Sequence, residues 1–425
     1  MSERSERAPM SNTYERIRGE VVAGGALGEE DPTVGGARAV IGIGVILVLL
    51  AVLAVASIWS FVFVVGLLIS IFLHECGHFF TARRSGMKVT QFFMGMGPKL
   101  WSTRRGEVEY GVRALPVGAF VRIIGMNNLD ETAPEDEPRA YRNKSYPRRM
   151  LTITAGSIMH MIIAIVLVFT VYSTFGKSQT TNQLGFFEVS KDGAAAAAGV
   201  KAGDLLISLD GQVPTTSDAL GEIVRSHQPG ETIDLVVDRD GQQLTFHPTL
   251  GTATEGEYKG AALLGVSSGQ KTEFFHHSLG YNITNSFADL GHVAWESVGG
   301  VIKVLNPVNI IHHLDGSNTD QSTQPMTAYG ISKFSSTIGE ETGLGGILLT
   351  LAGVNVFVGL LNMVPLLPFD GGHAAVATYE RIRSRKGKRY QADVGKMVPV
   401  AMAVMTFLVF ILFAGLYLDI TNPIR

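Results

Sequence analysis

Apolar residues gather in four segments of the chain that are long enough to cross a membrane as helices. A span needs about 20 consecutive, mostly apolar residues. The segments that reach this length are 38–82, 150–176, 343–370 and 397–419. The pattern therefore predicts an α-helical, polytopic membrane protein with about four transmembrane helices.

The first apolar segment is longer than one span requires. No charged residue occurs from Ala39 to Leu73, and a helix of that length would extend about 52 Å against a hydrocarbon core of about 30 Å. No proline or polar turn in it marks a hairpin, so we expect one tilted or protruding helix over 38–82. The polar residues 1–37 before it are typical of a disordered tail.

The pentapeptide His74-Glu75-Cys76-Gly77-His78 ends this first apolar run. Two histidines four residues apart lie on one face of a helix. That spacing allows both imidazoles to bind one zinc ion, with the intervening glutamate as general base. The alternative is a helix whose histidines are buried for other reasons, but it needs paired polar groups at membrane depth.

A second polar motif ends the third apolar segment, in the run Asn362-Met-Val-Pro365-Leu-Leu-Pro368-Phe-Asp370-Gly-Gly-His373. An aspartate after so many apolar residues is costly unless it is paired or bound to a metal. A helix-capping aspartate at a Pro-Gly turn is the alternative. His74 lies nine residues before Arg83, and Asp370 lies eleven before Arg381. Both motifs are therefore expected at a similar depth below one interface.

Basic residues are concentrated in two of the connecting segments. Residues 82–149 hold thirteen Lys/Arg and residues 376–396 hold seven, whereas residues 178–344 hold eight against nineteen Asp/Glu. Since cytoplasmic loops carry the excess of Lys/Arg, we expect 83–149 and 371–396 to be cytoplasmic. Four spans then leave both termini and the segment 178–344 outside. The net charge of −3 argues against a nucleic-acid partner.

The ordered pair of motifs resembles the site-2 protease family of intramembrane zinc metalloproteases. This resemblance implies a Zn²⁺ cofactor, with His74, His78 and Asp370 as its ligands and Glu75 as the catalytic base. It also places Asn362 and Pro365 close to the substrate.

Residues 83–149 resemble the membrane-reentrant β-loop of the same family, with Gly95 and Gly97 in its G-x-G element. The resemblance gives these glycines a substrate-binding role. An exposed edge strand in this region could pair with an unwound substrate by strand addition. An ordinary cytoplasmic hairpin is the alternative that periodicity leaves open.

The acidic segment between the second and third spans contains a candidate α+β domain. Glycine-rich turns and short alternating strands over 184–252 resemble a PDZ domain of bacterial site-2 proteases, here inserted on the outer side. The alternative is a spacer domain without affinity for peptides. Apolar residues at helical spacing indicate a linker with amphipathic helices over 253–342.

The family resemblance implies regulated intramembrane proteolysis in a bacterial cytoplasmic membrane. Its substrate would be a single-span membrane protein of the anti-sigma factor type, first cut outside by a site-1 protease. One rival is a membrane-anchored protease of soluble proteins, which predicts a hydrophilic helix around the zinc motif and a glutamate as third ligand. A second rival is a non-catalytic scaffold, which gives Glu75 no task.

Overall fold

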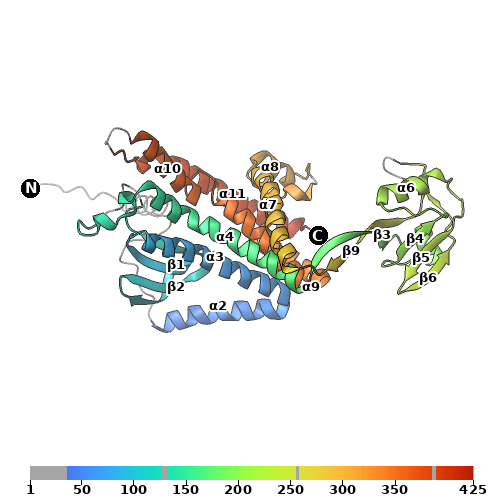
Figure 1. The fold of residues 1–425 in the computed structure, drawn as a ribbon, viewed down its shortest axis with the longest axis horizontal. Coiled ribbons are helices and arrows are strands. Elements are labelled where there is room, and N and C mark those ends of the chain that lie inside the picture. The colour runs from blue at the N-terminus through green and yellow to red at the C-terminus, as the bar shows by residue number, and fades with distance from the viewer. Residues whose placement is uncertain are drawn as a thin grey trace, which may run out of the picture. The chain divides into compact units, whose positions relative to one another are not determined.

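The computed structural model describes residues 36–424 apart from 127, 129, 131, 255–257, 319 and 385–388. The chain divides into two compact units, the first formed by Met1–Val171 with Leu279–Arg425 and the second by Tyr172–Ser278. Figure 1 labels most of their helices and strands. The disordered tail expected over 1–37 falls outside the described residues, except for its last two residues, which begin a helix.

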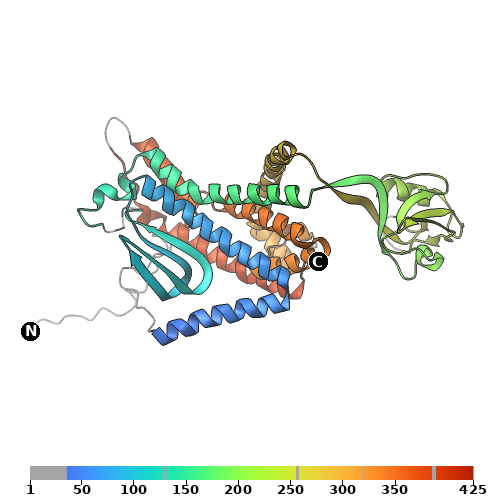
Figure 2. The same ribbon diagram turned by 60° about the horizontal axis from the view of Figure 1, so that its bottom comes forward.

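The first apolar run forms two helices, which corrects the expectation of one helix over 38–82. Helix α2 covers Gly36–Ala56 and α3 covers Ile58–Arg84. Ser57 between them is extended, and its hydroxyl accepts a hydrogen bond from the Ser60 N–H at 3.2 Å. Helix α2 folds back along α3 (Figure 2). One capping serine therefore makes a turn for which the sequence shows no proline or polar cluster.

Five helices of the described chain, rather than the predicted four, are long and apolar enough to cross a membrane. They are α2, α3, α4 (Tyr146–Thr174), α9 (Ala328–Leu361) and the segment Val394–Thr421 that contains α11 (Val398–Thr421). The fifth candidate span arises because the turn at Ser57 divides the first apolar run into two helices.

Helix α9 is kinked at Gly343, whose φ of 67° and ψ of −155° suit glycine alone.

The helix of the third apolar segment ends before its aspartate, which corrects the expected span over 343–370. Helix α9 stops at Leu361, residues 362–369 form turns, and a separate helix, α10, covers Asp370–Arg383. Proline lacks the N–H that a continuing helix requires, so Pro365 and Pro368 break it. Part of the loop expected over 371–396 is therefore helical.

Strands β1 (Val89–Arg105) and β2 (Val108–Ile123) form an antiparallel sheet in which each strand bends. Residues 89–96 of β1 pair with both halves of β2, whereas the second half of β1 pairs only with 108–113. Residues 115–123 consequently form one edge of the sheet. A Cβ on Gly95 would lie 2.5 Å from the Leu115 carbonyl oxygen, and its φ is 87°, so the bend requires glycine there.

A buried arginine holds the middle of this sheet. Arg113 is 2% exposed, and its guanidinium carbon lies 4.9 Å from the centre of the Phe93 ring and 5.0 Å from that of Phe120. Its Nη1 donates a hydrogen bond to the Gly97 carbonyl oxygen at 2.7 Å. The two aromatic faces and the carbonyl oxygen offset part of the cost of removing this charge from water.

The second unit is built on a five-stranded antiparallel sheet with the strand order β6-β5-β4-β3-β9. Its strands are β3 (Lys177–Val189), β4 (Leu205–Leu209), β5 (Leu235–Arg239), β6 (Gln242–Phe246) and β9 (Val266–Phe275). Short helices α5 (Ala194–Ala198) and α6 (Ser217–Ser226) and the hairpin β7 (Gly251–Thr252) and β8 (Ala262–Leu263) complete it. Because β9 pairs with β3, the unit extends beyond the expected 184–252 and includes part of the expected linker.

Two further helices precede α9 in the first unit. They are α7 (Leu279–Val304) and α8 (Pro307–Leu314). Together with the first half of α9, they occupy the remainder of the segment expected to hold a linker and amphipathic helices.

Candidate metal centre

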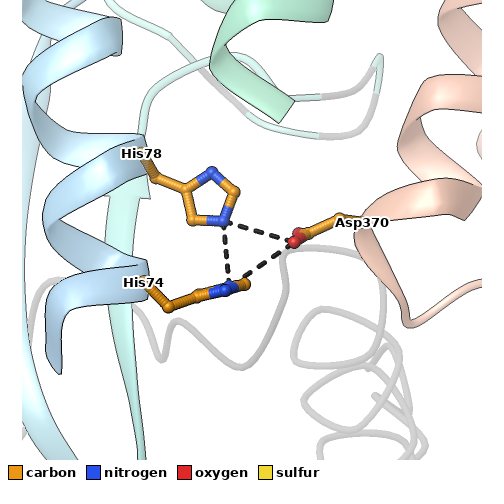
Figure 3. Close-up of side chains that lie close together, drawn as sticks. All are labelled: His74, His78 and Asp370. Atoms are coloured by element: carbon orange, nitrogen blue, oxygen red, sulfur yellow. Dashed lines mark hydrogen bonds and ion pairs between the residues drawn. The ribbon is translucent and has the colours of Figure 1, made fainter. Parts of the chain in front are cut away.

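Three polar side chains from two distant parts of the chain meet in the first unit (Figure 3). His74 and His78 lie one turn apart on α3, and their Nε2 atoms are 3.1 Å apart. Asp370, the first residue of α10, places its Oδ2 atom 3.5 Å from His74 Nε2 and 3.3 Å from His78 Nε2. The three predicted ligands thus form one cluster.

The donor set fits a zinc ion. Metal–ligand distances of about 2.0–2.1 Å in a tetrahedral site put neighbouring ligand atoms about 3.3 Å apart, which is close to the separations found here. Asp370 Oδ2 is buried without a hydrogen bond of ordinary geometry, as expected of an atom that serves a metal. Two imidazoles and one carboxylate are a ligand set of catalytic zinc, which keeps a fourth position for water or substrate.

Helix α4 contacts His78 through a backbone carbonyl group. The Nδ1 atom of His78 lies 2.8 Å from the Thr152 carbonyl oxygen. As a carbonyl can only accept, Nδ1 carries the proton and Nε2 keeps its lone pair for the metal. This contact fixes both the tautomer and the orientation of the His78 ring.

Gly156 of α4 faces the donor atoms so closely that no side chain fits there. A Cβ at this position would lie 2.3 Å from His74 Cε1, 2.4 Å from His78 Nε2 and 2.6 Å from His74 Nε2. Such an atom would compete with the metal for the same space. The sequence does not distinguish Gly156 from other glycines in apolar helices, so its contribution appears only in the structure.

A polar chain across three helices adjoins His74. The buried ring of His160 lies 4.8 Å from that of His74, and its Nδ1 is 2.8 Å from Asn355 Oδ1. The amide nitrogen of Asn355 donates to the Leu351 carbonyl oxygen and to the Ser70 hydroxyl. The Asn355 oxygen therefore accepts the Nδ1 proton of His160. The arrangement links α3, α4 and α9 beside the metal site.

Glu75 and the edge of the sheet share a cavity with the metal ligands. The cavity has a volume of about 200 Å³ and includes Glu75, His78 and Asp370 in its wall. Residues of β2 also line it, at Ala119, Phe120, Val121 and Ile123. The glutamate of the HExxH motif, two of the three clustered metal-ligand candidates and an edge strand without a second neighbour in the described chain therefore line one cavity.

The four residues predicted to bind substrate lie outside this cavity wall. Gly95 and Gly97 are at the bend of β1, and Asn362 is the C-cap of α9. Pro365 lies in the following turn, but Pro368, three residues later, lines the cavity together with His373. The β2 residues at the cavity carry no distinctive sequence motif, since their role depends on which edge of the sheet faces α3.

An HExxH helix, a carboxylate as third ligand and a glutamate beside the metal site define a class of protein, the zinc metalloproteases. In that class, the glutamate of this motif serves as the general base, and an open coordination position on the metal receives water or substrate.

Comparisons with known proteins identify the family. The model of peptidase family M50 matches residues 62–406. The zinc metalloprotease Rip1 of Mycobacterium tuberculosis is 32% identical over 402 residues, which cover 85% of this chain and 97% of the relative. Rip1 of Mycolicibacterium smegmatis is 32% identical over 406 residues, with the same coverage. The chain belongs to peptidase family M50, the site-2 protease family, and is a zinc metalloprotease with several helices long and apolar enough to span a membrane.

The family prediction made from the two motifs is thus confirmed, and so is the zinc cofactor.

Among solved structures, the PDZ domain of an SdrC-like protein from Listeria monocytogenes matches at 21% identity with a TM-score of 0.19. The match covers 21% of this chain and 90% of that domain.

Proposed function

We propose that this zinc metalloprotease cleaves single-span membrane proteins inside the bilayer. The observation that carries the proposal is the shared cavity, in which Glu75, the metal ligands and the edge of β2 come together. The helices that supply Glu75 and Gly156 are themselves apolar enough to span. A protease of soluble substrates would favour a hydrophilic helix around the motif. In this chain, the helix that carries the motif is apolar.

The chemistry assigns a task to each group. Bound zinc supplies a Lewis acid that polarises the scissile carbonyl and acidifies water. Glu75 takes the proton of the attacking water and returns it to the leaving amine. His74, His78 and Asp370 hold the metal, and Thr152 keeps His78 in the correct tautomer.

The substrate is expected to bind as a strand. A transmembrane helix hides its amides in its own hydrogen bonds, so it must unwind before hydrolysis. An unwound segment that pairs with residues 115–123 of β2 runs directly past Glu75. Gly95 and Gly97 then act through the bend of β1, and Asn362 and Pro365 act through the turn that leads to Asp370.

The positive-inside rule and the five candidate spans together suggest a topology. Basic residues follow α3 and end α10. They favour a cytoplasmic position for the end of α3 that carries the histidines and for α10. The turn at Ser57 then brings the start of α2 to the cytoplasmic side as well, instead of outside as four spans imply. The end of α11 and the second unit lie outside, in a bacterial cytoplasmic membrane.

This topology suits regulated intramembrane proteolysis. A site-1 protease first shortens the outer part of the substrate, and the second unit acts as a PDZ domain that receives or filters the shortened protein. An anti-sigma factor is the substrate type that we propose. Membrane lipids surround the enzyme, and nucleic acid has no part in the reaction.

The decisive experiment compares Glu75→Gln with Glu341→Gln in the full-length protein in liposomes. Each variant is given a reporter whose transmembrane segment is tagged at both ends and a soluble unfolded protein such as casein. We expect Glu75→Gln to bind zinc normally but to lose cleavage of the reporter by about 10³-fold or more. The exposed Glu341 provides the control, which should cleave like the wild type. Full activity of Glu75→Gln, or equal cleavage of casein and reporter by the wild type, would contradict the proposal.

A further inference from the structure

A second, basic pocket lies at the end of α3, beyond the metal centre. It has a volume of about 350 Å³ and is lined by Arg83, Arg105, Glu107 and Arg139, together with backbone around Gly86. By volume it has room for about ten water molecules, which is enough for a phosphate group and its ester substituent. The residues come from α3, from the β1–β2 turn and from the segment before α4.

Only one of the arginines in this pocket is neutralised by a carboxylate. Arg139 makes two hydrogen bonds to Glu107, of 2.6 and 2.7 Å. Arg83 and Arg105 form no ion pair with a carboxylate within the described residues. The guanidinium of Arg83 lies over the face of Phe79, and Glu107, which is already paired with Arg139, is close enough for the charge of Arg83 to help lower its pKa. The pocket wall therefore carries an excess of positive charge.

A lysine adds to this excess from beside Gly86. A Cβ on Gly86 would lie 3.4 Å from Lys144 Nζ, which places the ammonium at the border of the pocket. No acidic partner of Lys144 occurs in the part of the chain that the structure describes. Burial, with Arg148 and Arg139 nearby, lowers the pKa of Lys144. An anion bound here would relieve this accumulation of charge.

We propose that this pocket binds a phosphate group, supplied by the headgroup of an anionic phospholipid. Guanidinium groups recognise phosphate through paired, charge-assisted hydrogen bonds, which the unpaired arginines can offer. The pocket lies beside the last turn of a candidate span, where Arg83 and Arg84 follow the apolar residues. Headgroups occur at this level of a membrane, and a free phosphate compound is the other source of the same chemistry.

The test measures the thermal unfolding of the full-length protein in a neutral detergent with three additives. They are short-chain phosphatidylglycerol, phosphatidylcholine with the same tails, and inorganic phosphate. We expect phosphatidylglycerol to raise the melting temperature saturably, by about 5 °C at a hundredfold excess over its Kd, and phosphatidylcholine to have little effect. A comparable shift with inorganic phosphate would support the pocket but assign it to a soluble ligand.

Matched variants separate the pocket from general surface charge. Arg105→Gln with Lys144→Gln should weaken phosphatidylglycerol binding by about 25-fold, since each basic residue near a headgroup contributes about fivefold. Arg84→Gln removes one charge from the same turn of α3 but none from the pocket wall, and should change binding less than about twofold. The exposed Arg105 can be changed alone if the double variant unfolds. No saturable shift with either anion, or equal losses in Arg84→Gln and Arg105→Gln, would overturn the proposal. None of these measurements depends on proteolysis.

Discussion

The two sides of the metal centre are built in different ways. His74 and His78 are consecutive on one face of α3, so the geometry of the helix alone brings their Nε2 atoms together. Asp370 instead begins the short helix α10, after a turn with two prolines. Its position depends on what holds α10 to the rest of the unit.

A buried ion pair is the main polar contact that holds α10. Arg149 Nη2 lies 2.6 Å from Glu380 Oε2, and their side chains are 10% and 11% exposed. Glu380 also accepts a hydrogen bond from the Ala392 N–H, and the guanidinium of Arg149 lies over the Tyr141 ring. One side of the centre is therefore preorganised by local structure, whereas the other depends on tertiary contacts. The following predictions test this difference.

The largest effect is expected at Gly156, which lies against both histidines of α3. In Gly156→Ala the new methyl group would press on both histidines, so zinc binding should fall by about a thousandfold, more than the loss of one ligand would cause. Zinc content after dialysis against a weak chelator measures it. Ala155→Gly, at the neighbouring position, changes helix propensity by a similar amount in the opposite direction, and normal zinc content in it would show that helix propensity alone does not set zinc binding. Normal zinc content in Gly156→Ala would show that α4 does not face the donor atoms.

A smaller but selective effect is expected at the ion pair. Glu380→Gln leaves Arg149 buried without its counter-charge, which should cost about 3–5 kcal/mol of stability. Zinc affinity should fall about 10–100-fold through Asp370. The double variant Arg149→Met with Glu380→Leu should recover most of the stability, since an apolar pair of similar volume is often neutral. Zinc affinity is measured by competition with a chelator. If Glu380→Gln binds zinc as tightly as the wild type, Glu380 does not position Asp370.

Removal of zinc should loosen the two sides unequally. Without the metal, we expect amide hydrogen exchange to rise about tenfold in 362–369 and the first turn of α10. The turn of α3 from His74 to His78 should change little, because its own helical hydrogen bonds hold it. Exchange measured by mass spectrometry, with and without a chelator, makes the comparison. Equal loosening of both segments would remove the distinction.

The smallest effect on the metal centre is expected from the second unit. Its buried carboxylate, Asp204, is held by hydrogen bonds and has no part in metal binding. Burial favours the neutral form of Asp204, but hydrogen bonds from Arg239 and from the Lys201 N–H outweigh it and hold the pKa below its ordinary value. A lowered pKa stabilises the fold above the unfolded value, near 4, and the contribution is lost as the pH falls further.

The measurement follows amide protection of β4 in full-length protein as the pH is lowered through about 4. Asp204→Asn should reduce protection at neutral pH and abolish its pH dependence, whereas the exposed Asp192→Asn should not. Zinc content should stay unchanged in both. If amide protection of β4 rises as the pH falls, the pKa of Asp204 is not lowered in the folded protein.

The sequence predicted the family and the clustering of His74, His78 and Asp370, because the information for both is local or follows a family motif. The spacing of His74 and His78 specifies one face of a helix, and the polarity of Asp370 in an apolar context marks it as a candidate ligand. The turn at Ser57 was missed because one serine carries it. An exposed edge strand was expected in 83–149, but which edge faces the metal site, and the closeness of Gly156 to the histidines, depend on how the elements pack together. Composition and periodicity carry no information on that packing.

The buried Arg113 has a consequence for where the sheet can sit. A bare guanidinium would be driven toward water, but this one is enclosed by two phenyl rings and a carbonyl group of its own sheet. These contacts replace part of the hydration of the guanidinium, so the proposed topology does not require this charge to reach the aqueous phase. Under that topology, the edge of β2 would offer backbone hydrogen-bonding groups to an unwound peptide at a depth where lipid tails offer none.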